Sequence, residues 1–282
     1  MAADQVVVHD AGEGRVVCVD SAYDADGRNT GTDVVVTGSY CGVLPARFVS
    51  AHRPRAAIGL DCGIGPAGAG VAGLWYYEAL DIPAAAVDVM TVLLGDGVDV
   101  WTNGVVSMVN DPARRAGVRS GMAVADAARR LLAADAATGL GPADTTNRTV
   151  VVSGDDGDVV CTDSIAFGLP SDTDRNVLCT AGHTGRSAVP YLRRVRPRGF
   201  ICSDGGRGRD DSGIAGLAVV GAEGLAGACV DARTAAMGDG RSTYDDGVIS
   251  ARNDPAAARG VEVGMPASEA ALRLLSGPPA PP

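Results

Sequence analysis

Two glycine-rich turns in the chain each begin with an aspartate. One reads Asp-Cys-Gly-Ile-Gly from Asp61, and the other reads Asp-Gly-Gly-Arg-Gly from Asp204. Each turn follows an apolar run and precedes a helix-like segment, so its backbone N–H groups can hold an anion at the start of the helix. We predict that Asp204 is an acid/base group and that Gly206 and Gly208 are backbone donors to a substrate. The alternative, for the glycines of the following helix, is close packing on a sheet.

Three arginines of the second half lie in or beside glycine-rich turns: Arg207, Arg233 and Arg241. A guanidinium is a planar fork that binds carboxylates and phosphates through two hydrogen bonds, so we predict that these residues bind an anionic substrate. Asp239 and Ser242, which flank Arg241, complete the predicted binding site. The alternative for Arg241 is an exposed ion pair with an acidic neighbour, a kind of contact that contributes little.

One loop in each half carries a residue suited to proton transfer or nucleophilic attack: Cys41 in the first half and His183 in the second. Cys41 stands where a helix is expected to start, and the helix dipole lowers the pKa of a thiol there. His183 is the predicted proton shuttle. The alternatives are a partly buried thiol at Cys41 and a surface histidine that only forms hydrogen bonds.

The dipeptide Asp-Ser occurs at Asp20 and again at Asp163, each time directly after an apolar run. In the second half, Asp163 is a further candidate general base and Ser164 is a neighbouring hydroxyl. The alternative is an Asx turn that ends a strand. The Asn-Asp pairs that begin at Asn110 and Asn253 are predicted to be helix caps.

A constant offset relates the two halves of the chain. Adding 143 to a residue number in the first half gives its counterpart in the second, as from Asp61 to Asp204, and no gap is needed from about Val6 to Leu132. The chain is therefore predicted to be a tandem duplication that uses one fold twice. At the three arginine positions the first half is apolar: Ile64, Met90 and Val98. We expect a charged site in the second half and an apolar counterpart in the first.

Each half contains the same succession of predicted elements. In the first half, strands are expected at 16–19, 34–37, 56–60 and 84–89, and helices at 45–52, 69–80, from 111 onward and at 123–132. Apolar strands that alternate with helices indicate an α/β fold with a mostly parallel sheet and helices on its faces. Ligands bind beyond the carboxyl ends of the strands in such sheets, which is where the candidate residues cluster.

The predicted domain organisation has four segments: a first α/β repeat at 1–133, a linker at 134–148, a second α/β repeat at 149–276 and a disordered tail at 277–282. A repeat of roughly 140 residues is long enough to bury its own core. We expect the halves to be related by a pseudo-two-fold axis, as in an isologous dimer, while packing without symmetry stays open.

The net charge is -10, and none of the 24 basic residues is a lysine. This charge argues against a nucleic-acid partner or an anionic membrane. Without lysine, the chain cannot use Schiff-base, pyridoxal-phosphate or Walker-type P-loop chemistry in their usual forms. Seven cysteines, no secretory signal and no run long enough to span a bilayer together predict a cytoplasmic protein with reduced thiols.

The plan of two lobes with polar loops resembles that of the aspartate/glutamate racemases, which place one cysteine in each lobe. The offset pairs Cys41 with Thr184 and Cys62 with Gly205, so a matched pair of thiols is absent. No racemase residue is therefore carried over to this chain.

The sequence as a whole predicts a cofactor-independent enzyme, either a hydrolase, an isomerase or a lyase, that acts on a small anionic metabolite. No metal or cofactor is expected, and assembly into a homo-oligomer stays open. Two alternatives remain. One is a non-catalytic ligand-binding or structural pseudo-dimer, and the other is a cysteine-dependent enzyme that uses Cys41.

Overall fold

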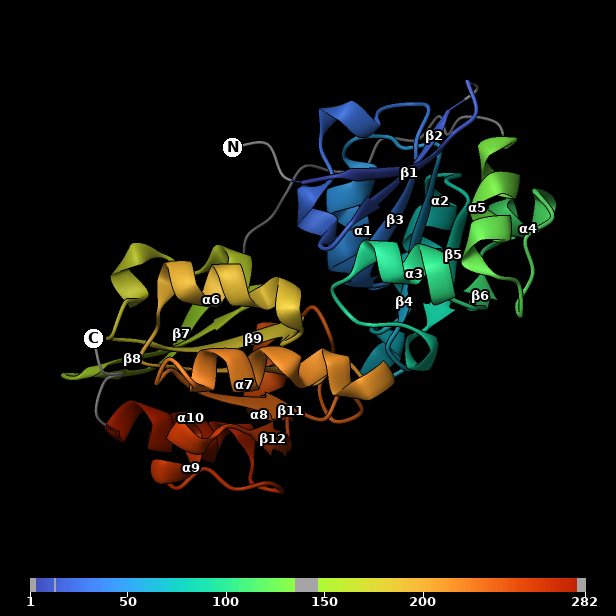
Figure 1. Cartoon of the computed structure of the whole chain (residues 1–282). Coiled ribbons are helices and arrows are strands. Elements are labelled where there is room, and N and C mark those ends of the chain that lie inside the picture. The colour runs from blue at the N-terminus through green and yellow to red at the C-terminus, as the bar shows by residue number, and fades with distance from the viewer. Residues whose placement is uncertain (1–3, 13, 135–146, 278–282) are drawn as a thin grey trace. The chain divides into compact units, whose positions relative to one another are not determined.

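The computed structural model describes residues 4–12, 14–134 and 147–277 and contains two compact units (Figure 1). The first unit comprises Met1–Ile64, Gly68–Asp144 and Gly208–Asp210, and the second comprises Gly65–Ala67, Thr145–Arg207 and Asp211–Pro282. Most of the predicted linker at 134–148 and of the predicted tail at 277–282 lies outside the described residues. The pseudo-two-fold relation between the halves stays a prediction.

The first unit contains one sheet of six strands, which follow each other in space in the order of the chain. The strands are β1 Val6–Asp10, β2 Arg15–Val19, β3 Val34–Tyr40, β4 Ala56–Asp61, β5 Ala84–Asp88 and β6 Val106–Val109. Strands β2 to β5 are parallel, whereas β1 and β6 pair antiparallel at the two edges. Val34, Val35 and Val36 are all fully buried, as expected of an inner strand that is covered on both faces.

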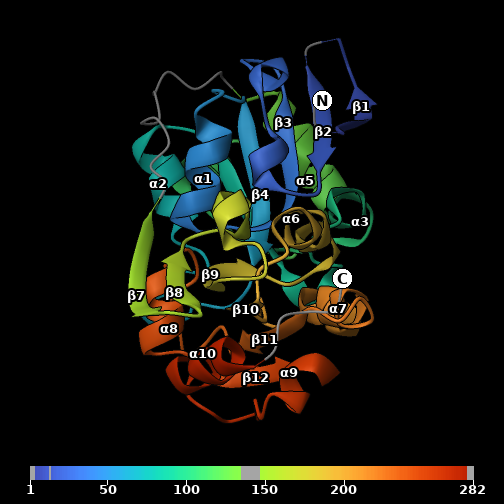
Figure 2. The same cartoon turned by 90° about the vertical axis from the view of Figure 1, so that its left-hand side faces the viewer.

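Five helices pack on this sheet. They are α1 Val43–Ser50, α2 Gly73–Ala79, α3 Gly97–Asn103, α4 Asp111–Arg115 and α5 Val124–Leu132. Helices α1 and α2 share a hydrophobic cluster with one face of the strands, through residues such as Val49, Leu74 and Val35. Helices α3 and α5 contact each other and the strands, and they lie on the opposite face (Figures 1 and 2).

The second unit repeats this arrangement with the same strand order. Its strands are β7 Arg148–Gly154, β8 Gly157–Thr162, β9 Val177–His183, β10 Gly199–Ser203, β11 Ala226–Val230 and β12 Ile249–Arg252. Its helices are α6 Val189–Val195, α7 Ala215–Gly221, α8 Gly240–Asp245, α9 Asp254–Ala258 and α10 Ala267–Ser276. Strands β3 and β9, and likewise helices α4 and α9, lie 143 residues apart at both ends. The predicted duplication of a mostly parallel α/β unit is therefore confirmed.

Two hydrophobic clusters cover the second sheet, one on each face. Helices α6 and α7 pack around Phe200 and Leu217, and helices α9 and α10 pack around Ile201 and Leu274. Phe200 and Ile201 are consecutive residues of β10, so their side chains point to opposite faces of the sheet. A bilayer-spanning helix needs about 20 apolar residues. None of the described helices meets this need, and the longest, α10, has 10 residues.

The structure corrects several predicted boundaries. The helix expected at 69–80 begins only at Gly73, because the chain first doubles back: a Cβ atom on Gly70 would lie 1.9 Å from the Gly63 carbonyl oxygen. Helix α4 begins at Asp111 as predicted, and its N-cap is Asn110, whose side chain accepts a hydrogen bond from the Ala113 N–H. The edge strands and helix α3 were not predicted.

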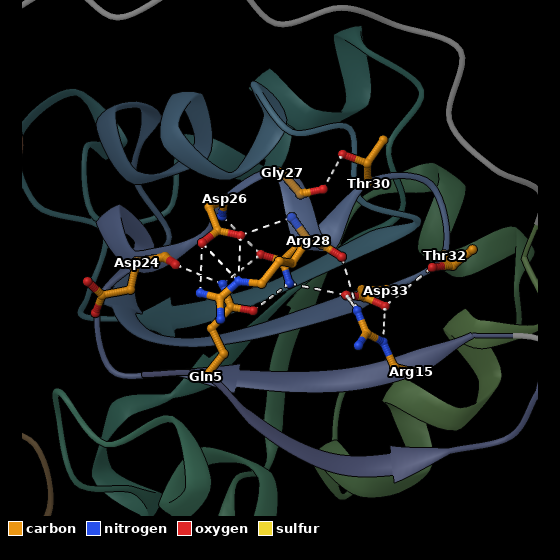
Figure 3. Close-up of polar contacts among 10 residues, drawn as sticks. Gln5, Arg15, Asp24, Asp26, Gly27, Arg28, Thr30, Thr32 and Asp33 are labelled. Carbon is orange, nitrogen blue, oxygen red and sulfur yellow. Dashed lines mark hydrogen bonds and ion pairs between the residues drawn. The ribbon is translucent and has the colours of Figure 1, made fainter. Parts of the chain in front are cut away.

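A buried ionic cluster closes the amino end of the first sheet (Figure 3). The carboxylate of Asp33 is fully buried, and Arg15 of β2 binds it twice, with Nε–Oδ1 and Nη2–Oδ2 distances of 3.0 and 2.7 Å. The amide of Asn29 donates to Asp33 Oδ2 at 3.1 Å and exchanges hydrogen bonds with Gln5. The cluster thus links the segments before β1 and β3 to strand β2.

The second repeat builds the same cluster with acid and amide exchanged. The buried acid is Asp172, at the position of Asn29, and Asn176 stands at the position of Asp33 and donates to Asp172 at 2.8 Å. The arginine also stands at a different position: Arg148, the counterpart of Gln5, forms the ion pair with Asp172. Both repeats therefore keep one buried carboxylate with one arginine, at different positions.

Candidate functional site

The carboxyl ends of the parallel strands in the second unit hold three of the predicted catalytic residues. Asp163 follows β8, His183 ends β9 and Asp204 follows β10, so parallel order places all three along one edge of the sheet. Their exposed fractions are only 8%, 9% and 4%. What these side chains can do chemically depends on their hydrogen-bond partners.

Asp204 accepts three hydrogen bonds from within the second unit. Oδ1 accepts the N–H groups of Gly206 and Ala232, both at 3.0 Å, and Oδ2 accepts the hydroxyl of Ser250 at 2.9 Å. The carboxylate thereby ties the end of β10 to the loop after β11 and to β12. Asp61 in the first repeat likewise accepts a turn N–H and a serine hydroxyl, at 3.0 and 2.8 Å. A partner set that recurs in both copies indicates a role in holding the fold.

The glycine-rich turn after Asp204 has an unusual backbone. Gly205, Gly206, Arg207 and Gly208 have φ angles of +64°, +72°, +72° and +69°, so four consecutive residues occupy the left-handed region. Only glycine adopts this region without a steric penalty. The glycines at 206 and 208 are thus required by the path of the chain, and the Gly206 N–H, a predicted substrate donor, binds Asp204 instead.

Asp163 and Ser164, directly after β8, both accept hydrogen bonds from backbone N–H groups. Asp163 Oδ1 accepts the N–H of Gly240 at 3.1 Å, and Ser164 Oγ accepts the backbone N–H two residues further on at 3.2 Å. Asp20 and Ser21 form the same two bonds in the first repeat, at 3.0 and 3.2 Å. Burial raises the pKa of Asp20 above its ordinary value. Only the serine bonds are local turn bonds, whereas each aspartate binds a residue 77 positions further along the chain and so forms no Asx turn through this bond.

His183 is held by the loop that follows β9. Its Nδ1 accepts the N–H of Gly185 at 3.0 Å, so a neutral ring carries its proton on Nε2. Tyr40 stands at the equivalent position of the first repeat. The imidazole is therefore specific to the second unit, unlike the two aspartates.

The three predicted anion-binding arginines are exposed and paired with acidic neighbours. Their side chains are 42%, 85% and 58% exposed for Arg207, Arg233 and Arg241. The Arg233 guanidinium holds the pKa of Asp231 below its ordinary value, chiefly through their hydrogen bonds. Exposed pairs of this kind contribute about 0–1 kcal/mol, so another anion can replace the carboxylate. The pairs are Arg207–Asp211 at 3.6 Å, Arg233–Asp231 at 2.5 Å and Arg241–Asp245 at 2.5 Å.

Asp239 and Ser242 build the start of helix α8. Asp239 Oδ1 accepts the N–H groups of Arg241 and Ser242, at 2.9 and 3.1 Å. The hydroxyl of Ser242 donates to Asp246 at 2.8 Å and accepts the N–H of Ala236 at 2.9 Å. Asp239 Oδ1 and the hydroxyl of Ser242 are thus engaged in local bonds.

Cys41 differs from its prediction in one physical respect. It directly precedes Gly42, the N-cap of α1, but it is only 3% exposed and belongs to the hydrophobic cluster of α1 and α2. Burial raises the pKa of its thiol from 9.0 to about 12. The expected lowering of the pKa by the helix start is therefore wrong, because desolvation of the thiolate outweighs the helix dipole.

All seven cysteines are buried, which predicts that their thiols react slowly with thiol reagents in the native protein. Raising a thiol pKa from 9.0 to about 12, as at Cys41, lowers the thiolate population near pH 8 by about a thousandfold. We expect less than one thiol per chain to react rapidly with dithiobis(nitrobenzoate) before unfolding, and all seven in denaturant. A fast native thiol that Cys41→Ser removes would restore the cysteine-enzyme alternative.

The sequence analysis missed one pair of equivalent residues that bind the strand-end aspartates, and it assigned too small a role to a second pair. Ser107 donates to Asp61 and Ser250 donates to Asp204, although no motif marks these serines. The available signal was the offset itself, because both copies keep a serine within otherwise different edge strands. Asn110 and Asn253, predicted only as caps, each make four hydrogen bonds.

Comparison of the chain with known protein families, with curated proteins and with solved structures finds no match. Among the described residues, no group of three or more histidine, cysteine, aspartate or glutamate side chains is arranged to hold a metal ion. Functional inference for this chain therefore rests on its own geometry and on the differences between its two copies.

Proposed function

We propose that the second unit binds a small anionic metabolite at the carboxyl-end edge of its sheet, and that it acts there as a binding protein. The observation that carries the proposal is the gain of three exposed arginines at this edge, two on loops and one, Arg241, in the first turn of helix α8. Their counterparts in the first unit are exposed and apolar, at 65%, 58% and 39%: Ile64, Met90 and Val98. Such apolar side chains offer no charge to an anion, so the two copies differ in the property that binding needs.

The hydrogen bonds of the aspartates favour binding over catalysis. A general base must accept a proton from a substrate, but three of the roughly four acceptor sites of the Asp204 carboxylate already accept bonds from the protein. Asp163 is engaged in the same way at Gly240. The first repeat keeps two of the three Asp204 bonds and the bond to Asp163, which supports a structural role for both carboxylates, so the non-catalytic alternative of the sequence analysis is the function that we prefer.

The proposal can be tested by exchanging the arginines for the residues of the first repeat. A ligand at a hundred times its dissociation constant stabilises a protein by about 2.7 kcal/mol. We expect some member of a panel of small carboxylates and phosphates to raise the melting temperature of the wild type. The triple variant Arg207→Ile, Arg233→Met and Arg241→Val should lose this shift.

A matched control is Arg193→Met, which removes another exposed ion pair of the second unit, with Glu223. This control should keep the full shift. The binding proposal fails if the triple variant keeps the shift as well. It is replaced by the enzyme alternative if a panel compound is converted to product and Asp204→Asn abolishes the conversion.

A further inference from the structure

All four cysteines of the second unit lie on neighbouring strands of its sheet, in two pairs of facing residues. Cys161 of β8 is the ladder partner of Cys179 of β9, and both strands run in the same direction. Cys202 of β10 is the ladder partner of Cys229 of β11 in the same way. The second unit therefore holds two pairs of thiols at the spacing of adjacent parallel strands.

The first repeat builds the same strands without these pairs. Cys18, the counterpart of Cys161, has Val36 as its ladder partner. The other three cysteines of the second unit stand where the first repeat has no thiol, at the positions of Val36, Gly59 and Ala86. The fold thus needs no sulfur at these three positions, and each exchange has placed a thiol directly opposite another one.

The two pairs differ in what their thiols contact. In the pair on β10 and β11, each sulfur lies 3.2 Å from a threonine hydroxyl: Cys202 from Thr180 and Cys229 from Thr184. The thiols of Cys161 and Cys179 are instead hydrogen-bonded to each other, and this bond together with burial raises the pKa of Cys179 above its ordinary value. The pair on β8 and β9 is therefore the one whose sulfur atoms face each other.

The pairing of β8 with β9 meets the spatial requirement of a disulfide. Two cysteines can be bridged when their Cα atoms lie about 4.4–6.8 Å apart and their side chains do not point apart. Neighbouring strands of a sheet lie about 4.7–4.9 Å apart, so facing residues fall within this range. Cys161 and Cys179 also belong to the same hydrophobic cluster, which places both side chains on one face of the sheet.

We propose that Cys161 and Cys179 form a disulfide while the second unit folds, when a small disulfide such as oxidised glutathione is present. The Cys161 thiolate attacks one sulfur of oxidised glutathione, which forms a mixed disulfide and releases one glutathione. The Cys179 thiolate then attacks the Cys161 sulfur and releases the second glutathione. Two protein thiols are oxidised, one glutathione disulfide is reduced, and the two protons pass to the released glutathione thiolates.

Burial fixes the state of the pair once the unit has folded. Cys161 and Cys179 are 3% and 0% exposed, so a reagent reaches them only while the strands are open. A bond formed during folding is then protected from reductants, and a pair that folded as thiols is protected from oxidants. The pair thus preserves the redox conditions under which the chain folded. It shares no residue with the arginine edge, so this inference does not depend on the proposed function.

The test refolds the full, reduced chain from denaturant, once with reduced glutathione alone and once with a mixture of reduced and oxidised glutathione. We expect the mixture to join the tryptic peptides 149–175 and 176–186, which separate when a reductant is added. Protein that is already folded should stay reduced in the same mixture. Because a cross-link restricts the unfolded chain, the joined protein should unfold with a roughly hundredfold smaller equilibrium constant than the reduced protein.

Two variants that install residues of the first repeat make the test specific. Cys179→Val removes one member of the pair and should leave no joined peptides, whereas Cys229→Ala disrupts the other pair and should leave the bond intact. Circular dichroism checks that both variants fold. The inference is wrong if the wild type yields no joined peptides or joins a different pair. It is also wrong if the joined protein melts below the reduced one, or if folded protein is oxidised as fast as the unfolded chain.

Discussion

Replacing Asp33 by alanine should destabilise the first unit by about 1–3 kcal/mol, because the partly exposed guanidinium of Arg15 loses the carboxylate that two of its nitrogens bind. The Asp33 carboxylate is fully buried, and Arg15, whose side chain is 35% exposed, binds both of its oxygens. Asn29 would lose an acceptor as well. Because Asn29 is fully buried, its amide stays shielded from water after it loses this acceptor, and we therefore expect a larger effect than for an exposed ion pair.

Chemical unfolding of wild type and variant measures this loss, and an exposed ion pair of the same unit provides the control. Asp126 pairs with Arg129 at 3.0 Å, but both side chains are exposed, so Asp126→Ala should cost less than about 1 kcal/mol. A loss at Asp33 as small as that at Asp126 would show that water replaces the carboxylate at little cost, contrary to this account.

The second repeat suggests a rescue. Its buried acid stands at the position of Asn29 and its arginine at the position of Gln5. We expect the combined change Gln5→Arg, Arg15→Asp, Asn29→Asp and Asp33→Asn to restore most of the stability that Asp33→Ala loses. The comparison separates the need for a buried ion pair from the need for an acid at position 33.

The parts of the fold that the sequence predicted depend on local pattern and on the duplication. The buried run at Val34–Val36 and the apolar strand at Ala56–Asp61 carry their own signal, because both faces of an inner parallel strand are covered. The edge strands β1 and β6 have exposed positions such as Val6 and Val7, at 48% each, and lack such a run. Their pairing is decided by neighbours distant in sequence, which a local pattern does not contain.

The candidate site was predictable in position but not in its chemistry. Because strands β8, β9 and β10 are parallel, their carboxyl ends place Asp163, His183 and Asp204 at one edge of the sheet. The partners that engage Asp204 come from Ala232 and Ser250, which lie 28 and 46 residues further along the chain. Burial of Cys41 likewise depends on the distant helix α2, which packs in the same cluster. Whether a polar residue is free to act is thus a property of tertiary packing.

Asn253 illustrates how much a single buried side chain can hold together. It is 7% exposed, and its Oδ1 accepts the N–H groups of Gly227 and Ala256, at 3.0 and 3.1 Å. Its Nδ2 donates to the carbonyls of Leu225 and Leu217, at 2.9 and 3.2 Å. One amide therefore joins helix α7, strand β11 and the start of helix α9.

Asn253→Ala should destabilise the second unit by about 3–5 kcal/mol, because four backbone groups lose their partner and each unpaired buried group costs about 1–3 kcal/mol before relaxation. Such a loss lowers the melting temperature by roughly 10 °C. Asn110 makes the equivalent four bonds in the first unit, so Asn110→Ala should destabilise that unit to a similar degree. The control is Asn103→Ala. Asn103 is exposed, and among the described residues its side chain donates one hydrogen bond, to Asp99 at 2.9 Å. Equal and small effects of all three substitutions would mean that water replaces the amide at these junctions. A large loss at Asn253 and Asn110 alone would establish the asparagine as the residue that both copies need to join their last strand and helix to the sheet.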